Sequence, residues 1–221
     1  LPEDAARFAK IDMEVKTNLQ IASKTTKVLD SCNRSGLLAK LEHLSEQLEL
    51  CKKSLADFLD GKRRQFPRFY FVSEADLLDI LSNGSTPAKI LTHVTKVFLS
   101  TDTLMLKDTA GNPRPSATHW KSGVGVEVVE FDSPVVLEGK VEIYLQTVLT
   151  SMQRTLNHAL MKSYQRYPTQ TRIEWLQDKA PDDTATDPAA MTVLVAAMKY
   201  VSEVEEAFQA IGRGEREALQ E

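Results

Sequence analysis

The residue types that could carry chemistry are few in this sequence, and they are scattered. The four histidines fall on separate predicted elements, without the H-x-x-x-H or H-E-x-x-H spacing that brings two metal ligands to one helix face. Polar side chains are mostly exposed in folded proteins, so we expect each histidine to be a surface or capping residue. The pattern therefore predicts no metal site at His43, His93, His119 or His158.

Motifs for nucleotide binding and for nucleophilic catalysis are also missing. The sequence contains no GxxxxGK phosphate loop, no complete GxGxxG fingerprint around the "GVG" at residues 123–125, and no GxSxG nucleophile turn. The acid pairs Glu205–Glu206 and Asp182–Asp183 lie in polar surroundings and are interpreted as charge balance rather than as a general acid and base. We therefore expect no catalytic residue, no cofactor and no enzymatic activity in this segment.

Charge and composition restrict the partners. The 221 residues are 42% hydrophobic and 26% charged, as in an ordinary globular protein, and the formal net charge is −4. Such a balance gives no general attraction to nucleic acid or to an anionic membrane surface, so neither is expected as a partner. The one dense basic run is Lys62, Arg63 and Arg64, which we interpret as a site of local electrostatic docking.

The cysteines and the first residues of the sequence bear on its cellular context. Cys32 and Cys51 lack CxxC spacing and favour a reducing, cytoplasmic compartment. No apolar run approaches the ~20 residues that cross a bilayer, and "LPED" at the start has neither the basic start nor the apolar core of a signal peptide. The chain also lacks an initial Met, and we expect it to be part of a longer protein.

Helical periodicity dominates the first hundred residues. Apolar residues predict a helix from residue 2 to about 31, interrupted near Thr25–Thr26, and a second helix from Leu37 to Gly61. The second helix should contribute a bundle seam, and the first should bury its own apolar side. The residues expected on these faces are Phe8, Ile11, Val15, Leu19, Val28, Leu29, Leu37, Leu41, Leu44, Leu48, Cys51, Leu55 and Phe58.

The pattern changes near Ser100 and changes back near Gly139. A short helix over residues 74–81 with Ser73 as its cap, and another beginning at Pro87, precede a small antiparallel β element between about Thr103 and Leu137. A long helix then runs from about residue 139 to 167, followed by a short helical segment around Trp175. The last predicted helix covers residues 189–212, and its buried face is expected to comprise Val193, Leu194, Ala197, Val201, Val204, Phe208 and Ile211.

One stretch, "KRRQFPRFYF" at residues 62–71, concentrates basic and aromatic residues around a proline. Because the residue before proline avoids the α region, we expect Phe66 to be extended and the following residues to form a short extended run. Neighbouring side chains of such a run point opposite ways, so Phe69 and Phe71 should be buried more deeply than Tyr70. The segment is interpreted as a structural joint or docking surface made of Phe66, Pro67, Arg68, Phe69, Tyr70 and Phe71.

These residues carry a family resemblance. The stretch "CKKSLADFLDGKRRQFPRFYFVSEADLLDILSNGSTPAKILTHVTKVF", from Cys51 to Phe98, resembles the linker region of dynein heavy chains, with its KSL-x-x-aromatic-L helix followed by FPRFYF and LL-x-ILS. "LPEDAARFAKID" and "VEIYLQTVLTSMQRTL" resemble flanking helices of that region. "RIEWL" and "VSEVEEAF" resemble its closing segments, shortly before the first AAA+ module.

The resemblance implies a mechanical role. In dyneins the linker is an elongated helical arm that lies across a ring of AAA+ modules, and ATP-driven changes in its bend and docking move the motor along microtubules. By this resemblance the nucleotide motifs, with ATP and Mg, belong to the ring. The partners implied are the AAA+ ring of the same heavy chain, the microtubule indirectly, and other dynein chains.

The sequence departs from the family pattern near its end. Between Trp175 and Val193 the family runs quickly through a Pro-x-Gln turn, whereas "APDDTATDPAAM" is longer and lacks the Gln. Tyr200 occupies a position where the family commonly has Trp. The difference weakens the expectation of tight packing there, and it favours an axonemal chain, located in a cilium or flagellum, over a cytoplasmic one.

Together these observations predict a mainly α fold: an elongated multi-helix arm with a small antiparallel β insert. We expect residues 1–100 to form a helical subdomain with the aromatic joint, residues 101–138 the β insert, and residues 139–221 a helical subdomain leading toward the ring. The alternatives are a static helical scaffold or protein-interaction module with no motor role, and an ATPase fragment with its own nucleotide site.

Overall fold

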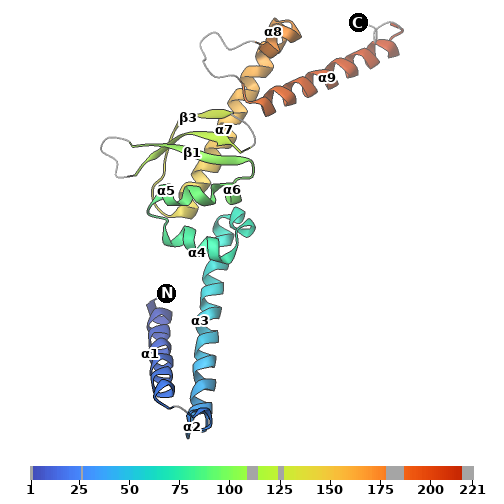
Figure 1. Cartoon of the computed structure of the whole chain (residues 1–221). Coiled ribbons are helices and arrows are strands. Elements are labelled where there is room, and N and C mark those ends of the chain that lie inside the picture. The colour runs from blue at the N-terminus through green and yellow to red at the C-terminus, as the bar shows by residue number, and fades with distance from the viewer. Residues whose placement is uncertain (1, 26, 109–113, 124–126, 178–186, 216–221) are drawn as a thin grey trace. The chain divides into compact units, whose positions relative to one another are not determined.

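The computed structural model describes residues 2–25, 27–108, 114–123, 127–177 and 187–215 (Figure 1). The fold is mainly α-helical with one three-stranded antiparallel sheet, as predicted. The chain divides into two compact units, Leu1–Tyr70 and Phe71–Glu221. The predicted division into three segments and the elongated form of the arm stay predictions.

The first unit is built on two long helices. Helix α1 (Pro2–Lys24) packs against α3 (Leu37–Gln65), with the short helix α2 (Val28–Cys32) between them in sequence (Figure 1). The predicted interruption after α1 is confirmed, since α1 ends at Lys24 and the next helix begins at Val28. Gly36 is the N-cap residue of α3, and its φ of +74° is a left-handed conformation that favours glycine.

The buried face of this unit is narrower than the periodicity predicts. Only Ile11 of α1, and Leu44 and Leu59 of α3, are buried. The prediction is therefore wrong for several other apolar side chains, because a two-helix contact covers a narrower stripe than a full bundle does. The exposed ones are Phe8, Val15, Leu19, Val28, Leu29, Leu41, Leu48 and Phe58.

Four short helical pieces open the second unit. Helix α4 (Glu74–Ser82) begins as predicted, because the Ser73 hydroxyl accepts a hydrogen bond from the Asp76 N–H at 3.2 Å. The helix expected from Pro87 is instead divided into α5 (Pro87–Ile90), η2 (Leu91–His93) and α6 (Val94–Val97). The apolar residues Ile90, Val94, Val97 and Phe98 on these pieces are buried.

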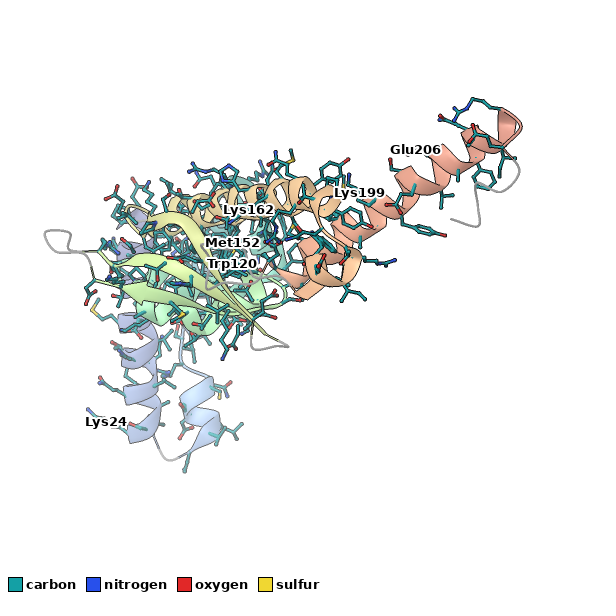
Figure 2. All side chains as sticks on the ribbon, turned by 90° about the horizontal axis from the view of Figure 1, so that it is seen from above. Lys24, Trp120, Met152, Lys162, Lys199 and Glu206 are labelled. Carbon is teal, nitrogen blue, oxygen red and sulfur yellow. The ribbon has the colours of Figure 1, made fainter. Side chains whose placement is uncertain are left out.

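The predicted β element is a meander of β1 (Thr101–Lys107), β2 (Ser116–Ser122) and β3 (Val128–Val136), in that order across the sheet. Helix α7 (Val141–Arg166) packs against β3 (Figure 1). Trp120 of β2 and Met152 of α7 are both buried, and Figure 2 shows them within the layer between sheet and helix. This layer is the core of the second unit.

The chain closes with η3 (Tyr167–Thr169), α8 (Arg172–Gln177) and α9 (Ala189–Gly212). Helix α9 has the predicted bounds, but the prediction of its buried face is wrong. Val195 and Ala210 are buried, whereas Val193 is 70% exposed and Phe208 is 60% exposed. In Figure 2, Lys199 lies on the part of α9 beside α7, and Glu206 lies on the part that projects away from it.

Candidate functional site

The aromatic segment begins where α3 ends. Phe66 has φ −135° and ψ 93°, so it is extended as its position before proline predicts. Pro67–Phe71, however, form the 3₁₀ helix η1, and the predicted extended run is wrong. The φ of proline, near −65°, is as compatible with a 3₁₀ turn as with an extended chain.

The helical turn changes which rings are buried. With about three residues per turn, Phe66 and Phe69 fall on one side, and both are fully buried. Their ring centroids lie 5.0 Å apart at an interplanar angle of 83°, an edge-to-face contact. Phe71 is 80% exposed, which corrects the prediction that it would be buried more deeply than Tyr70. The packed part of the segment is therefore the pair of Phe66 and Phe69.

Two of the basic residues beside this pair, Lys62 and Arg64, contact residues of their own helix. Arg64 forms an ion pair with Asp60 at 2.7 Å, and the Lys62 ammonium lies 5.6 Å from the centroid of the Phe58 ring. Cations in the last turn of α3 also complement the helix dipole, which helps this helix to continue past Gly61, its predicted end. The Tyr70 hydroxyl lies 3.3 Å from the same Asp60 carboxylate. Docking by Lys62, Arg63 and Arg64 stays a prediction.

A second packed joint ties the start of α7 to the loop after α4. The hydroxyl of Tyr144, which is 2% exposed, donates a hydrogen bond to the Gly84 carbonyl at 3.2 Å. The Arg114 guanidinium donates to the same carbonyl at 3.4 Å and to the Ser85 carbonyl. Burial raises the pKa of Tyr144 to about 12, because the phenolate would lose its hydration. A Cβ at Gly84 would lie 3.3 Å from the Val141 Cβ, so the backbone approaches α7 closely here.

The segment around Trp175 is tightly packed, although the sequence departs from the family pattern immediately after it. Trp175 is buried, and its indole N–H donates to the Ser163 carbonyl of α7 at 3.2 Å. Its ring meets Tyr167 edge-on at 5.1 Å. On the neighbouring side, the Lys199 ammonium of α9 lies 3.9 Å from the centroid of the Tyr164 ring. These contacts hold α7, α8 and α9 together.

His93 departs from the expectation of a surface histidine, because it is buried. Its Nε2 lies 2.8 Å from an Asp79 carboxylate oxygen, and its Nδ1 lies 3.5 Å from Asp76. The Lys96 ammonium approaches Asp76 at 2.8 Å and, together with Ser73, lowers the pKa of that carboxyl. His93 therefore links η2 to α4, a contact between elements that helical spacing does not reveal.

No catalytic constellation is seen in the part of the chain that the structure describes. Glu205 and Glu206 are exposed on α9, and Asp182 and Asp183 lie outside the described residues. Among the described residues, no group of three or more His, Cys, Asp or Glu side chains is placed to hold a metal ion. No described helix is long and apolar enough to cross a membrane.

The fold and these joints define a class of protein: a mainly helical structural segment whose elements meet through buried aromatic side chains. Comparison with known proteins gives the family. The family model "Dynein heavy chain, N-terminal region 2" matches residues 1–163, and the chain belongs to the dynein heavy chain family.

Three relatives illustrate the match. The chain is 40% identical over 221 residues to the dynein alpha chain of the flagellar outer arm from Chlamydomonas reinhardtii, and 39% identical over 220 residues to the beta chain of that arm. It is 36% identical over 227 residues to dynein axonemal heavy chain 17 from Homo sapiens. Each alignment covers at least 99% of this chain but only 5% of the relative, so the chain spans a small part of their length.

The predicted family is confirmed, and the relatives named above carry flagellar or axonemal names. The aromatic segment lies inside the matched region. What the sequence could not show is how the joints at Tyr144 and Trp175 form. Each joint connects residues that are distant along the chain. In the sequence, the only indication of each joint is an aromatic residue with one polar group, which needs a hydrogen-bond partner when it is buried.

Proposed function

We propose that this chain is a segment of the mechanical linker of an axonemal dynein heavy chain. In this role it docks on the AAA+ ring of the same heavy chain and transmits ATP-driven conformational change into movement along microtubules. ATP and Mg bind in the ring, outside this segment. The motor acts in the axoneme of a cilium or flagellum, where other dynein chains are its neighbours.

The observation that carries the proposal is the alignment of almost the whole chain with axonemal and flagellar heavy chains. The structure supplies a physical reason why such a segment could transmit force. Helix α3, at 29 residues, is about 43 Å long at 1.5 Å per residue, and it ends at the buried Phe66–Phe69 pair. A close-packed aromatic joint resists deformation, because protein interiors have low compressibility.

The test is whether this segment moves relative to the ring during the ATP cycle. We would place one fluorophore on α3 and its partner on the first AAA+ module of the purified heavy chain, and record energy transfer with ATP and vanadate and without nucleotide. The proposal expects two distinct transfer efficiencies. An efficiency that does not change with nucleotide would favour the static scaffold instead.

A control separates a moving segment from a general change of the fluorophores. A second pair of fluorophores is placed within the second unit, on α7 and on β2, which share one packed core. Its transfer efficiency should be the same in every nucleotide state. A change there would mean that the segment itself rearranges, which contradicts a rigid lever.

A further inference from the structure

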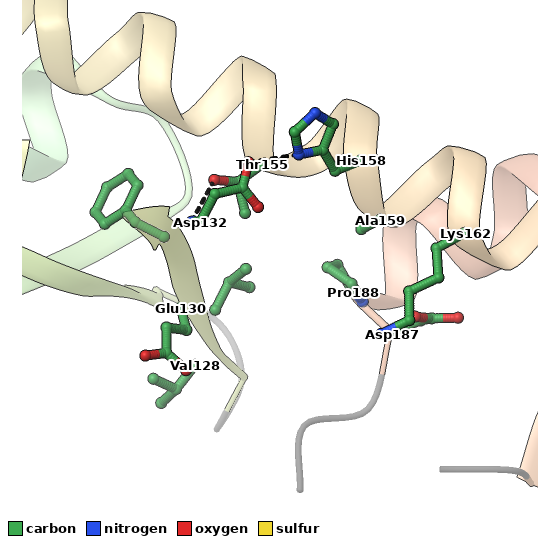
Figure 3. Close-up of a pocket in the computed structure, with 11 residues that line it drawn as sticks. Val128, Glu130, Asp132, Thr155, His158, Ala159, Lys162, Asp187 and Pro188 are labelled. Carbon is green, nitrogen blue, oxygen red and sulfur yellow. Dashed lines mark hydrogen bonds and ion pairs between the residues drawn. The ribbon is translucent and has the colours of Figure 1, made fainter. Parts of the chain in front are cut away.

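A groove lies along the outer edge of the sheet, on a side that the joints described above do not use. It encloses about 350 Å³ between β3 residues 128–132, the α7 residues His158 and Lys162, and the residues Asp187 and Pro188 that lead into α9 (Figure 3). All of these residues belong to the second unit. Glu127, just before β3, helps to fix the groove, because its carboxylate accepts a hydrogen bond from the Ala189 N–H at 2.7 Å.

Two hydrogen bonds show which backbone groups of β3 face the groove. The Ser122 N–H of β2 donates to the Glu127 carbonyl at 2.9 Å, so Glu127 faces the neighbouring strand. The Asp132 N–H donates to the Thr155 hydroxyl of α7 at 3.1 Å, so Asp132 faces the other way (Figure 3). Backbone groups of alternate residues on a strand point to the same side. Val128 and Glu130 must therefore direct their N–H and C=O groups into the groove.

These backbone groups specify what could fill the groove. No described residue forms a hydrogen bond to the backbone N–H or C=O of Val128 or Glu130 on this side. The two residues repeat the same donor and acceptor about 6.8 Å apart along the strand. Another extended chain offers matching groups at that interval, and this is the basis of recognition by strand addition.

Several charges at or beside the groove are already paired within the unit. The His158 imidazole lies 2.7 Å from the Asp132 carboxylate and the Arg154 guanidinium lies 3.7 Å from it, while Arg166 pairs with Asp187. An incoming charged side chain would have to compete with these partners. Ala159 and Pro188 add small apolar surfaces. The groove therefore suits a segment with small, uncharged side chains that binds through its backbone.

The length of the relatives indicates where such a segment comes from. This chain covers only 5% of the flagellar alpha chain. Tethering within one polypeptide gives an effective concentration in the millimolar range for short flexible connections. We propose that an extended segment of the heavy chain from outside residues 1–221 adds to β3 as a fourth strand at Val128 and Glu130. This inference holds whether or not the segment acts as a lever.

The first experiment is residue-resolved amide hydrogen exchange on the purified intact heavy chain. Val129, which pairs with Trp120 of β2, serves as the internal reference. Strand addition predicts that the amides of Val128 and Glu130 are protected about 100-fold or more over an unstructured chain, as expected for hydrogen bonds that break only on local unfolding. Exchange of these two amides at the unstructured rate would overturn the proposal.

A matched pair of variants distinguishes strand addition from nonspecific burial. Glu130→Pro removes one N–H that faces the groove and no bond to β2, so it should abolish the protection at Val128 and leave that at Val129 unchanged. Glu130→Ala retains the N–H and should keep the protection. Equal protection at Val128 in both variants would overturn the proposal.

The source of the added strand is tested by photo-crosslinking, which does not depend on any destabilising variant. A benzophenone amino acid replaces Val128 in the purified heavy chain, and the crosslinked peptides are identified by mass spectrometry. The proposal predicts a link to one segment of the same chain outside residues 1–221. Links confined to residues 1–221, links only to another protein, or no link at all would each overturn it.

Discussion

Phe66 and Phe69 meet edge to face, with ring centroids 5.0 Å apart, at the point where α3 passes into η1. Both rings are fully buried, while Phe71, two residues further on, is 80% exposed. The same short segment therefore contains a packed pair and an unpacked ring of the same residue type. The same substitution can therefore be made at a buried phenylalanine and at an exposed one, and the two effects can be compared directly.

Phe69→Ala should lower the free energy of unfolding by about 3 to 5 kcal/mol, because it removes a fully buried ring and leaves a cavity. Urea unfolding followed by circular dichroism measures the change. Phe71→Ala is the control and should cost less than about 1 kcal/mol, the range of ordinary surface changes. Equal losses in the two variants would show that the buried pair does not stabilise the segment.

Phe69→Leu tests the aromatic contact separately from burial. Leucine keeps the site apolar but removes the edge-to-face interaction, which contributes about 0.5 to 1.5 kcal/mol beyond area burial. The decrease in the free energy of unfolding that Phe69→Leu causes, measured in urea, should lie clearly between the decreases for Phe71→Ala and Phe69→Ala. A loss as large as that of Phe69→Ala would mean that ring shape, and not only burial, determines packing at this site.

Tyr144 predicts a dependence of stability on alkaline pH. Its pKa is raised to about 12 in the folded chain, against about 10 for an unperturbed tyrosine. The unfolded chain therefore loses this proton first as the pH rises, so the stabilisation is complete below pH 10 and declines between pH 10 and about 12. The full decline is on the order of 2 to 3 kcal/mol. Tyr144→Phe should remove this part of the pH dependence, and identical slopes for both proteins above pH 10 would contradict the assignment.

Trp175 should contribute through both its ring and its N–H. Trp175→Phe keeps an aromatic ring against Tyr167 but leaves the buried Ser163 carbonyl without its indole donor. The Ser163 carbonyl still accepts a hydrogen bond from the Tyr167 N–H, so the cost is that of one lost hydrogen bond, about 0.5 to 1.5 kcal/mol. Urea unfolding measures this cost, and Ile173→Ala serves as a control, since Ile173 is exposed on the same short helix. A cost for Trp175→Phe no greater than that for the control would show that the hydrogen bond is not formed in solution.

The extents of most elements could be predicted from the sequence, because local signals determine them. Ser73 caps α4 as predicted, and α9 has its predicted bounds. Burial was predicted less well, since periodicity identifies an apolar face but not whether a partner covers it. Phe208 on α9 is exposed for that reason. At Pro67 the local signal was ambiguous, since a proline φ fits both an extended chain and a 3₁₀ turn.

The candidate site was predicted in part. Phe66 and Phe69 were named from sequence, but their mutual contact depends on the 3₁₀ turn. The buried position of His93 and the groove beside Val128 depend on elements distant in sequence, which periodicity cannot bring together. The family was recognised from the motif that contains the aromatic run.

The central claim is that this segment couples ATP hydrolysis to movement, and microtubule gliding per ATP hydrolysed tests it most directly. The intact motor would carry Phe66→Leu and Phe69→Leu together, with Phe71→Leu as the matched control and limited proteolysis to verify folding. Because the chemistry is assigned to the ring, we predict that ATP turnover in the double variant stays within a few-fold of the parent motor, while gliding velocity falls much further. The control should retain both. Gliding and turnover that fall in proportion in a folded double variant, or gliding that does not change, would contradict the claim.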